Sequence, residues 1–155
     1  MNNNSEVQCV LSGIKLFKGC SQEQIKVIIS YGKTIRFRKG ETIIREGEPA
    51  PGLNILMAGE VDVKLPKISP DRRRLSEIHL YSMRHGDYVG EFSLIDGKPA
   101  SASAVALNDC FIFHISRNSF YELVDKYDSI AKNIYRNMLE VMVARGREYD
   151  EELDM

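Results

Sequence analysis

The chain has few residues of the kinds that bind metals, and they are widely spaced. Its 155 residues include three histidines and three cysteines, with no His-x-His or Cys-x-x-Cys pair. Structural zinc sites and iron–sulfur clusters need such closely spaced ligands, and a cupin-type metal enzyme needs clustered histidines with a carboxylate. No Gly-x-Ser-x-Gly elbow, phosphate-loop motif or dinucleotide fingerprint occurs either. The sequence therefore predicts a protein that is not an enzyme and requires no cofactor.

The chain also lacks the apolar run of about 18 residues that a membrane span needs. Its N-terminus, MNNNSEVQCV, is polar and has no apolar core typical of a signal peptide. Cys9, Cys20 and Cys110 are odd in number and far apart in sequence, which suits a reducing compartment. These features predict a cytoplasmic protein with no membrane partner.

Neither sign of charge dominates the chain. Its 21 Lys and Arg against 22 Asp and Glu give a formal net charge of −1, which provides no general attraction to nucleic acid. The cluster Arg72–Arg74 is typical of a solvated turn. Because the chain also ends in the acidic stretch EYDEELDM, we expect no DNA-binding domain and no nucleic-acid partner.

Residues 34–115 have the pattern of many short strands. Apolar and polar residues alternate over 35–38, 53–57 and 61–63. Glycine stands at nearly every corner between such segments, as tight turns with positive φ require. The chain is 43% hydrophobic, enough to bury a core. This region predicts an antiparallel sandwich or barrel.

Helical patterns flank the predicted strands. SQEQIKVIIS, residues 21–30, opens with a capping box of Ser21 and Gln24, and another short helical or turn segment precedes it. A helix capped by Ser116 or Ser119 follows the strands, and a longer one runs from about Ser129 to beyond Arg145. We expect one domain over 1–155, with short helices and the barrel at about 11–127 and the long helix at about 128–150.

The long helix carries an apolar stripe that Asn137 interrupts. The stripe consists of Ile130, Ile134, Val141 and Ala144. It can pack on its own domain, or on a second copy, where one polar residue in a coiled-coil seam can set the register. Both arrangements stay open, and the length of the helix slightly favours a homodimer.

The stretch YVGEFSLIDGKPASASAVALND, residues 88–109, combines Gly90 and Glu91 with many small residues. The following FSLI can form one helical turn, whose first backbone N–H groups attract anions. Glu91 can accept hydrogen bonds from a diol such as ribose, and Ser101 and Ser103 offer hydroxyl donors. The pattern fits a sugar-phosphate pocket, and it equally fits a tight turn in which Glu91 faces water.

Two stretches resemble a known family. RKGETIIREGEPAPGLNILMAGEVDV and GDYVGEFSLIDGKPASASAVALNDC are similar to the glycine-punctuated half and the phosphate-binding cassette of the cyclic-nucleotide-binding domain. That domain occurs in catabolite-activator-type regulators, protein kinase A regulatory subunits and gated channels. The resemblance extends from about Leu11 to the last helix. It implies an antiparallel β-barrel of the jelly-roll (double-stranded β-helix) type, mainly β, with short N-terminal helices and C-terminal helices.

The resemblance also implies ligand-binding residues. In the family the cassette reads roughly Gly-Glu-Leu-Ala-Leu and then Pro-Arg-x-Ala-Thr. Its Glu holds the ribose 2′-hydroxyl, its Arg pairs with the cyclic phosphate, and backbone amides complete the anion site. Gly90 and Glu91 match this motif, while Ala100 stands at the Arg position. The candidate ligand-binding residues are Gly90, Glu91, Phe92, Ser93, Ala100, Ser101 and Ser103.

The missing arginine predicts weak binding. A charge-assisted hydrogen bond contributes about 1.5–3 kcal/mol, so its loss weakens affinity by up to about two orders of magnitude. Lys98 or Arg84 can offer a substitute charge. We therefore expect a stand-alone sensor module for cyclic AMP, cyclic GMP or another small anion.

In this reading the long helix acts as a lid over the ligand and signals to a separate protein effector. One alternative is a degenerate domain that serves as a scaffold for dimerisation or protein interaction. Another is a haem-based sensor in which His79 or His85 binds the iron.

Overall fold

Two antiparallel sheets form the centre of the molecule in residues 3–153, the part of the chain that the computed structural model describes. Each sheet has four strands, and a two-stranded hairpin, β5–β6, extends from the second. The first sheet has the order β1 (Lys33–Phe37), β10 (Cys110–Ile115), β3 (Leu53–Ala58) and β8 (Tyr88–Val89). The second has the order β2 (Thr42–Ile44), β9 (Ser103–Ala106), β4 (Val61–Leu65) and β7 (Ile78–Met83). The hairpin consists of β5 (Ile68–Ser69) and β6 (Arg72–Arg73).

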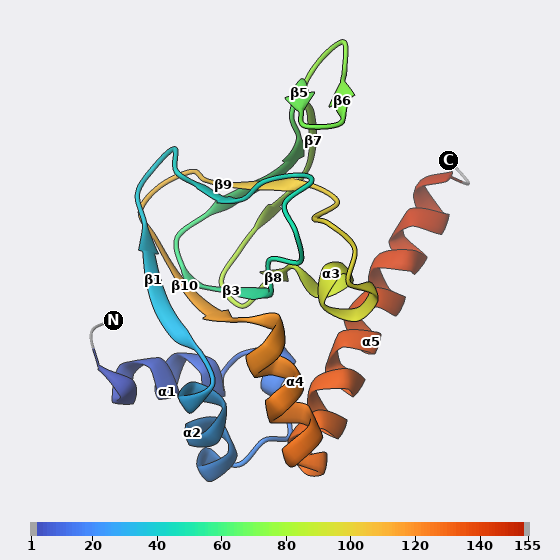
Figure 1. The fold of residues 1–155 in the computed structure, drawn as a ribbon. Helices are drawn as coiled ribbons and strands as arrows, with labels where there is room; N and C mark the ends of the chain where they lie inside the picture. Colours follow the sequence, from blue (N-terminus) through green and yellow to red (C-terminus); the bar gives the residue numbers. More distant parts are fainter. Residues whose placement is uncertain (1–2, 154–155) are drawn as a thin grey trace.

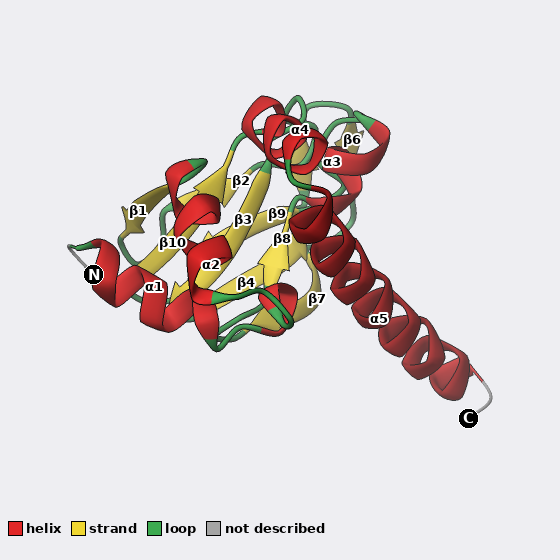
Figure 2. Ribbon diagram, turned by 90° about the horizontal axis from the view of Figure 1, so that it is seen from below, coloured by secondary structure: helices red, strands yellow, loops and turns green. Residues whose placement is uncertain are grey.

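Helices cover one end and one side of this barrel (Figures 1 and 2). The N-terminal elements are α1 (Asn4–Ser12), the 3₁₀ turn η1 (Lys15–Phe17) and α2 (Gln22–Ser30). The later ones are α3 (Glu91–Asp96), α4 (Arg117–Lys126) and α5 (Asp128–Leu153). Figure 2 shows α5 running away from the barrel toward the C-terminus. The predicted mainly β fold with flanking helices is confirmed.

Local sequence signals explain where the helices begin. The Ser21 side chain accepts a hydrogen bond from the Gln24 backbone N–H, and the Gln24 side chain accepts one from Ser21, which completes the predicted capping box of α2. Of the two candidate caps for α4, Ser116 is the N-cap, and it accepts from the Ser119 N–H.

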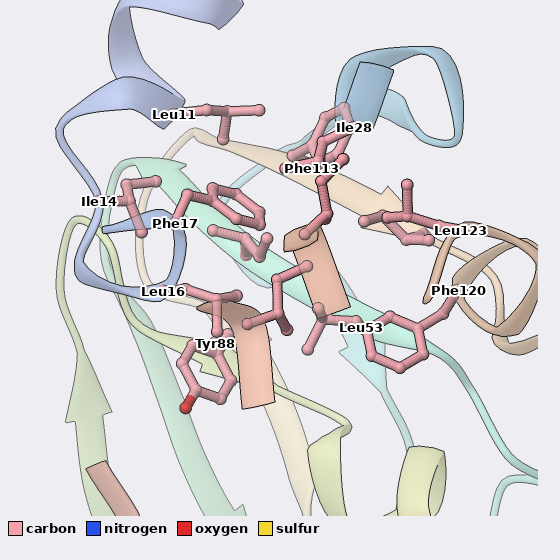
Figure 3. Packing of buried hydrophobic residues seen from close by; sticks show 14 of the residues in the cluster. Leu11, Ile14, Leu16, Phe17, Ile28, Leu53, Tyr88, Phe113, Phe120 and Leu123 are labelled. Carbon is pink, nitrogen blue, oxygen red and sulfur yellow. The ribbon is translucent and has the colours of Figure 1, made fainter. Parts of the chain in front are cut away.

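A hydrophobic cluster joins the helices to the first sheet (Figure 3). Leu11 and Phe17 from the N-terminal elements pack with Phe113 of β10 and Phe120 of α4, and all four are at most 1% exposed. A second cluster lies between the sheets and includes Ala100 from the cassette. The first cluster fixes α4 and the first half of α5 relative to the strands, which matters for the cassette because α3 lies beside both helices.

Asn137 does not lie in a coiled-coil seam. Its side chain is 3% exposed, and its Nδ2 donates hydrogen bonds to the backbone carbonyls of Leu16, at 2.7 Å, and Lys18, at 3.0 Å. The interpretation of Asn137 as a register-setting residue between two copies is therefore wrong. A buried amide is stable here because it satisfies carbonyls that η1 leaves without helical partners.

Within residues 3–153, no helix is both long and apolar enough to cross a membrane.

Candidate functional site

The cassette connects the two sheets beside α5. The chain leaves β8, turns at Gly90, forms α3, and returns through residues 97–102 to β9. Gly90 has φ 97°, and a Cβ there would collide with the carbonyl oxygen of Gly52. Only glycine fits both restraints. Gly90 is thus required by the turn itself, and it places Glu91 in the first turn of α3.

Glu91 points into the molecule. It is 8% exposed, so the alternative in which this residue of a tight turn faces water is wrong. Burial raises the pKa of its carboxyl, whereas a hydrogen bond from the Glu91 backbone N–H and, after it, the charge of Arg145 act in the opposite direction. The Glu91 Oε1 lies 3.8 Å from Nη1 of Arg145, beyond the length of a good hydrogen bond. A buried carboxylate with this environment is well suited to accept hydrogen bonds from a ligand.

Two tyrosines, Tyr81 of β7 and Tyr88 of β8, share this environment. Burial, followed by the charge of Glu91, raises the pKa of Tyr88 to about 12, and burial also raises the pKa of Tyr81. Both phenols are therefore neutral near pH 7. Tyr88 is in the hydrophobic cluster under the barrel (Figure 3), whereas the Tyr81 ring stacks against the guanidinium of Arg145 at 5.0 Å.

Only some of the predicted site residues have side chains inside the protein. Glu91, Ser93, Ala100 and Ser103 are buried. Phe92 is 54% exposed and Ser101 is also exposed, so their side chains point away from the interior. Their backbone groups still belong to the cassette.

The loop between β2 and β3 holds the cassette in place. The Ala100 N–H donates to the Glu48 carbonyl and the Gly47 N–H donates to the Ala100 carbonyl, both at 2.8 Å. The Glu46 N–H donates to Ser103 Oγ, also at 2.8 Å. Ser103 is therefore an acceptor for this loop, and the Ala100 side chain faces the interior in a fixed direction.

Neither substitute cation named from the sequence reaches this interior. The Lys98 side chain is on an exposed turn, where its backbone N–H donates to Asp96 Oδ1. Arg84 is exposed on another turn, where its N–H donates to Asp87 Oδ2.

Sequence reasoning missed Arg74, which stands in a half-buried ion pair. Its Nη1 and Nη2 donate to the two carboxylate oxygens of Glu46 at 2.8 and 2.7 Å, and Nη1 also donates to the Pro66 carbonyl. The side chains of Arg74 and Glu46 are 14% and 12% exposed. Hydrogen bonds from Arg74 lower the pKa of Glu46. The pair fastens the hairpin region to the loop that holds the cassette.

α4 supports the other end of α3. The Tyr121 hydroxyl donates to the Leu94 carbonyl at 2.6 Å, and the Arg117 guanidinium stacks on the Tyr121 ring at 5.0 Å. Gly97 ends α3 with φ 71°, the left-handed conformation that favours glycine. These contacts leave the Glu91 end of α3 facing α5.

The two histidines considered as haem ligands have protein partners. His79 Nδ1 pairs with the Asp62 carboxylate, and the His79 side chain is 57% exposed. His85 Nδ1 hydrogen-bonds with the Met57 carbonyl at 2.8 Å. Among the described residues, no group of three or more His, Cys, Asp or Glu is placed to hold a metal ion.

Known proteins share this architecture. A solved cyclic nucleotide-binding domain from Methylobacillus flagellatus superposes with a TM-score of 0.79 at 28% identity, covering 97% of this chain and 82% of that one. The cyclic AMP receptor protein of Thermus thermophilus is 27% identical over 145 residues, 94% of this chain and 63% of that protein. The cAMP-dependent protein kinase regulatory subunit of Emericella nidulans is 31% identical over 99 residues, 64% of this chain and 22% of that protein.

The chain spans less than two thirds of the length of these two curated relatives. The expected jelly-roll barrel with N- and C-terminal helices is confirmed by the fold and its neighbours. A family model described as the cyclic nucleotide-binding domain matches residues 34–127. The chain belongs to the cyclic nucleotide-binding domain family.

Proposed function

We propose that this chain is a regulatory module that binds a cyclic nucleotide weakly, or another small anionic ligand, and signals through α5 to a separate protein effector. The buried carboxyl of Glu91 carries this proposal, because the family's Gly-Glu motif and an inward-facing acceptor coincide there. The names of the relatives, a cyclic AMP receptor and a cAMP-dependent kinase regulatory subunit, support cyclic AMP as the first candidate.

The environment of Glu91 supports a hydroxyl-bearing ligand. A carboxylate withdrawn from water loses free energy unless it accepts hydrogen bonds, and the raised pKa of Glu91 reflects that loss. A ribose 2′-hydroxyl can donate a further hydrogen bond to this carboxylate, beside the one from the Glu91 backbone N–H. Ligand binding then offsets part of the free-energy cost of burying the Glu91 carboxylate.

Ala100 supports weak binding. It stands at the family's arginine position, and its backbone is held by Gly47 and Glu48, so no neighbouring residue replaces it by a simple shift in register. Without a bidentate arginine, affinity is expected to fall by about 10- to 100-fold relative to a cassette that has one.

Signalling through α5 is supported by its two sets of contacts. The first half of α5 is anchored in the domain through Ile130, Ile134 and Asn137. Further along, Arg145 approaches Glu91 and Tyr81. A ligand at Glu91 therefore changes the surroundings of the second half of α5, while the first half stays fixed.

Thermal unfolding with cyclic AMP and cyclic GMP at up to millimolar concentration tests the proposal. A ligand at 100 times its Kd stabilises the fold by about 2.7 kcal/mol, which corresponds to a Tm rise of about 5–10 °C for a chain of this size. Glu91→Ala should reduce the rise by about half, because a tenfold loss of affinity removes about 1.4 kcal/mol. Glu23→Ala is the matched control, because Glu23 is also in the first turn of a helix but is exposed. No rise with either nucleotide would refute cyclic-nucleotide binding.

A second candidate function is association through α5, the scaffold alternative. Leu139, Met142 and Val143 are 61%, 49% and 56% exposed on this helix, an apolar surface that a second copy or an effector can cover. Sedimentation should then show a dimer that Leu139→Lys converts to a monomer. A monomeric wild type at high concentration would refute self-association.

The cytoplasmic location also stays a proposal, based on the three unpaired cysteines.

A further inference from the structure

A cyclic phosphate in the cassette needs a positive partner that Ala100 does not supply. Several basic side chains within residues 3–153 lie around the cassette. They differ in whether a carboxylate already occupies their hydrogen-bond donors. A guanidinium whose donors are already matched by a carboxylate is unavailable to a ligand unless that ion pair breaks. The basic side chain best placed to bind the phosphate is one that lies near Glu91 and is not already in a hydrogen-bonded ion pair.

Arg74 is close to the cassette but already matched. Its two donors to Glu46, at 2.8 and 2.7 Å, form a bidentate pair, and a third donor goes to the Pro66 carbonyl. A phosphate would have to displace the half-buried Glu46 carboxylate from its bidentate partner. Arg74 therefore has a structural role: it holds the hairpin region against the β2–β3 loop.

Arg117 is directed to the wrong end of α3. Its Nη2 lies 3.4 Å from the position of a Cβ on Gly97, the residue that ends the helix. Glu91 is in the first turn, about 9 Å away along the helix axis. Lys98 and Arg84 are exposed on turns.

Arg145 differs from all of these. It reaches from α5 to Glu91, with Nη1 3.8 Å from Oε1, a distance too long for a matched hydrogen-bonded pair. Its guanidinium is held over the Tyr81 ring at 5.0 Å. The side chain is 40% exposed, so a ligand entering from solvent can contact it.

We propose that Arg145 is the residue that binds the ligand's phosphate, in place of the arginine that the cassette lacks, a role that rests on the proposed function. In the ligand-free protein its charge partly compensates Glu91. When a cyclic nucleotide enters, the ribose hydroxyl binds Glu91 and the guanidinium turns to the phosphate. The positive partner thus comes from α5 and not from the cassette, and the anion itself connects the cassette to the helix.

In this assignment Arg145 contacts the phosphate and not the base or the ribose. A pair of ligands that differ in the phosphate can therefore test it. Cyclic AMP and adenosine share base and ribose, but only cyclic AMP carries the charge. Arg145→Gln should weaken cyclic AMP binding by about 10- to 100-fold and change adenosine binding by less than about twofold. Arg145→Lys should recover part of the loss, since a single ammonium keeps the charge without the bidentate geometry.

Arg147→Gln is the matched control, because Arg147 is an exposed arginine two residues further along the same helix; it should leave both affinities unchanged. Calorimetric titration of the full chain gives both affinities. An equal loss for the two ligands on Arg145→Gln would overturn the assignment, since Arg145 would then act by positioning Glu91 or the base. An unchanged cyclic AMP affinity would also overturn it. A wild type that itself does not bind cyclic AMP would instead refute the proposed binding of a cyclic nucleotide. The failure of the Arg145 assignment and the failure of the proposed function therefore give different results.

Discussion

Replacing Ala100 by arginine restores the residue that the family places at this point of the cassette. Ala100 is 8% exposed, and hydrogen bonds of its N–H and C=O to Glu48 and Gly47 fix the direction of its side chain. A guanidinium introduced there starts from a buried position of the cassette. A charge-assisted bond contributes about 1.5–3 kcal/mol, so Ala100→Arg should raise the affinity for cyclic AMP by about 10- to 150-fold.

The same substitution should destabilise the ligand-free protein. A buried charge without a partner costs about 3–5 kcal/mol, and about 2–4 °C of Tm is lost per kcal/mol in a chain of this size. The expected fall is therefore about 6–20 °C, and saturating cyclic AMP should reverse most of it.

Calorimetry and thermal unfolding of the same protein samples measure both effects. Lys98→Arg is the control, because it introduces a guanidinium on the exposed turn of the cassette and should change neither affinity nor Tm. A folded Ala100→Arg protein with unchanged affinity would refute the reasoning, since the phosphate would then lie away from position 100.

Three further predictions concern stability. Asn137→Ala removes two buried hydrogen bonds to backbone carbonyls and should lower the free energy of unfolding by about 2–4 kcal/mol in urea titrations; a loss below about 0.5 kcal/mol would contradict the anchoring of α5. Arg74→Met removes the guanidinium that donates to both oxygens of the Glu46 carboxylate and should lower the Tm, whereas the double change with Glu46→Leu should recover much of this loss. The folded protein holds the Glu91 proton more tightly than the unfolded chain, so this residue's contribution to stability is complete below its ordinary pKa and is lost as the pH rises through the raised value. The Tm difference between Glu91→Gln and the wild type should therefore grow in favour of the variant as pH rises from about 4 to about 7; a constant difference would contradict the burial of a titrating carboxyl.

Local patterns in the sequence predicted the elements whose signals are local. The alternation of apolar residues predicted the strands, and Ser21 with Gln24 predicted the start of α2, which the structure confirms. The family motif predicted the position of Gly90 and Glu91 in the cassette, but not that Glu91 is buried. That fact depends on how α3 packs beside α5.

The missed features depend on residues far apart in sequence. Arg145 meets Glu91 and Tyr81 only because α5 passes beside α3 and β7. Arg74 meets Glu46 only because the hairpin region lies against the β2–β3 loop. The partners of each pair are too far apart in sequence for a helical or strand periodicity to predict their contact. An arginine cluster that looked like a solvated turn thus contains one half-buried member, Arg74.

Asn137 shows why the apolar stripe of α5 was misread. A polar residue within a stripe can serve a coiled-coil register or can satisfy polar groups of its own domain. The two are indistinguishable without the position of η1, whose carbonyls lie about 120 residues earlier in the chain. The short helix α3 posed a similar problem, since six residues are too few for a periodic pattern to show that Phe92 points outward.

The most direct test of the account compares the binding of cyclic AMP and its 2′-deoxy analogue to the wild type and to Glu91→Ala by calorimetry. If the Glu91 carboxylate accepts the ribose hydroxyl, the wild type should bind cyclic AMP at least about tenfold more tightly than the deoxy analogue, and Glu91→Ala should lose this preference. A wild type that binds neither ligand at millimolar concentration, or a preference that survives Glu91→Ala, would contradict the central claim.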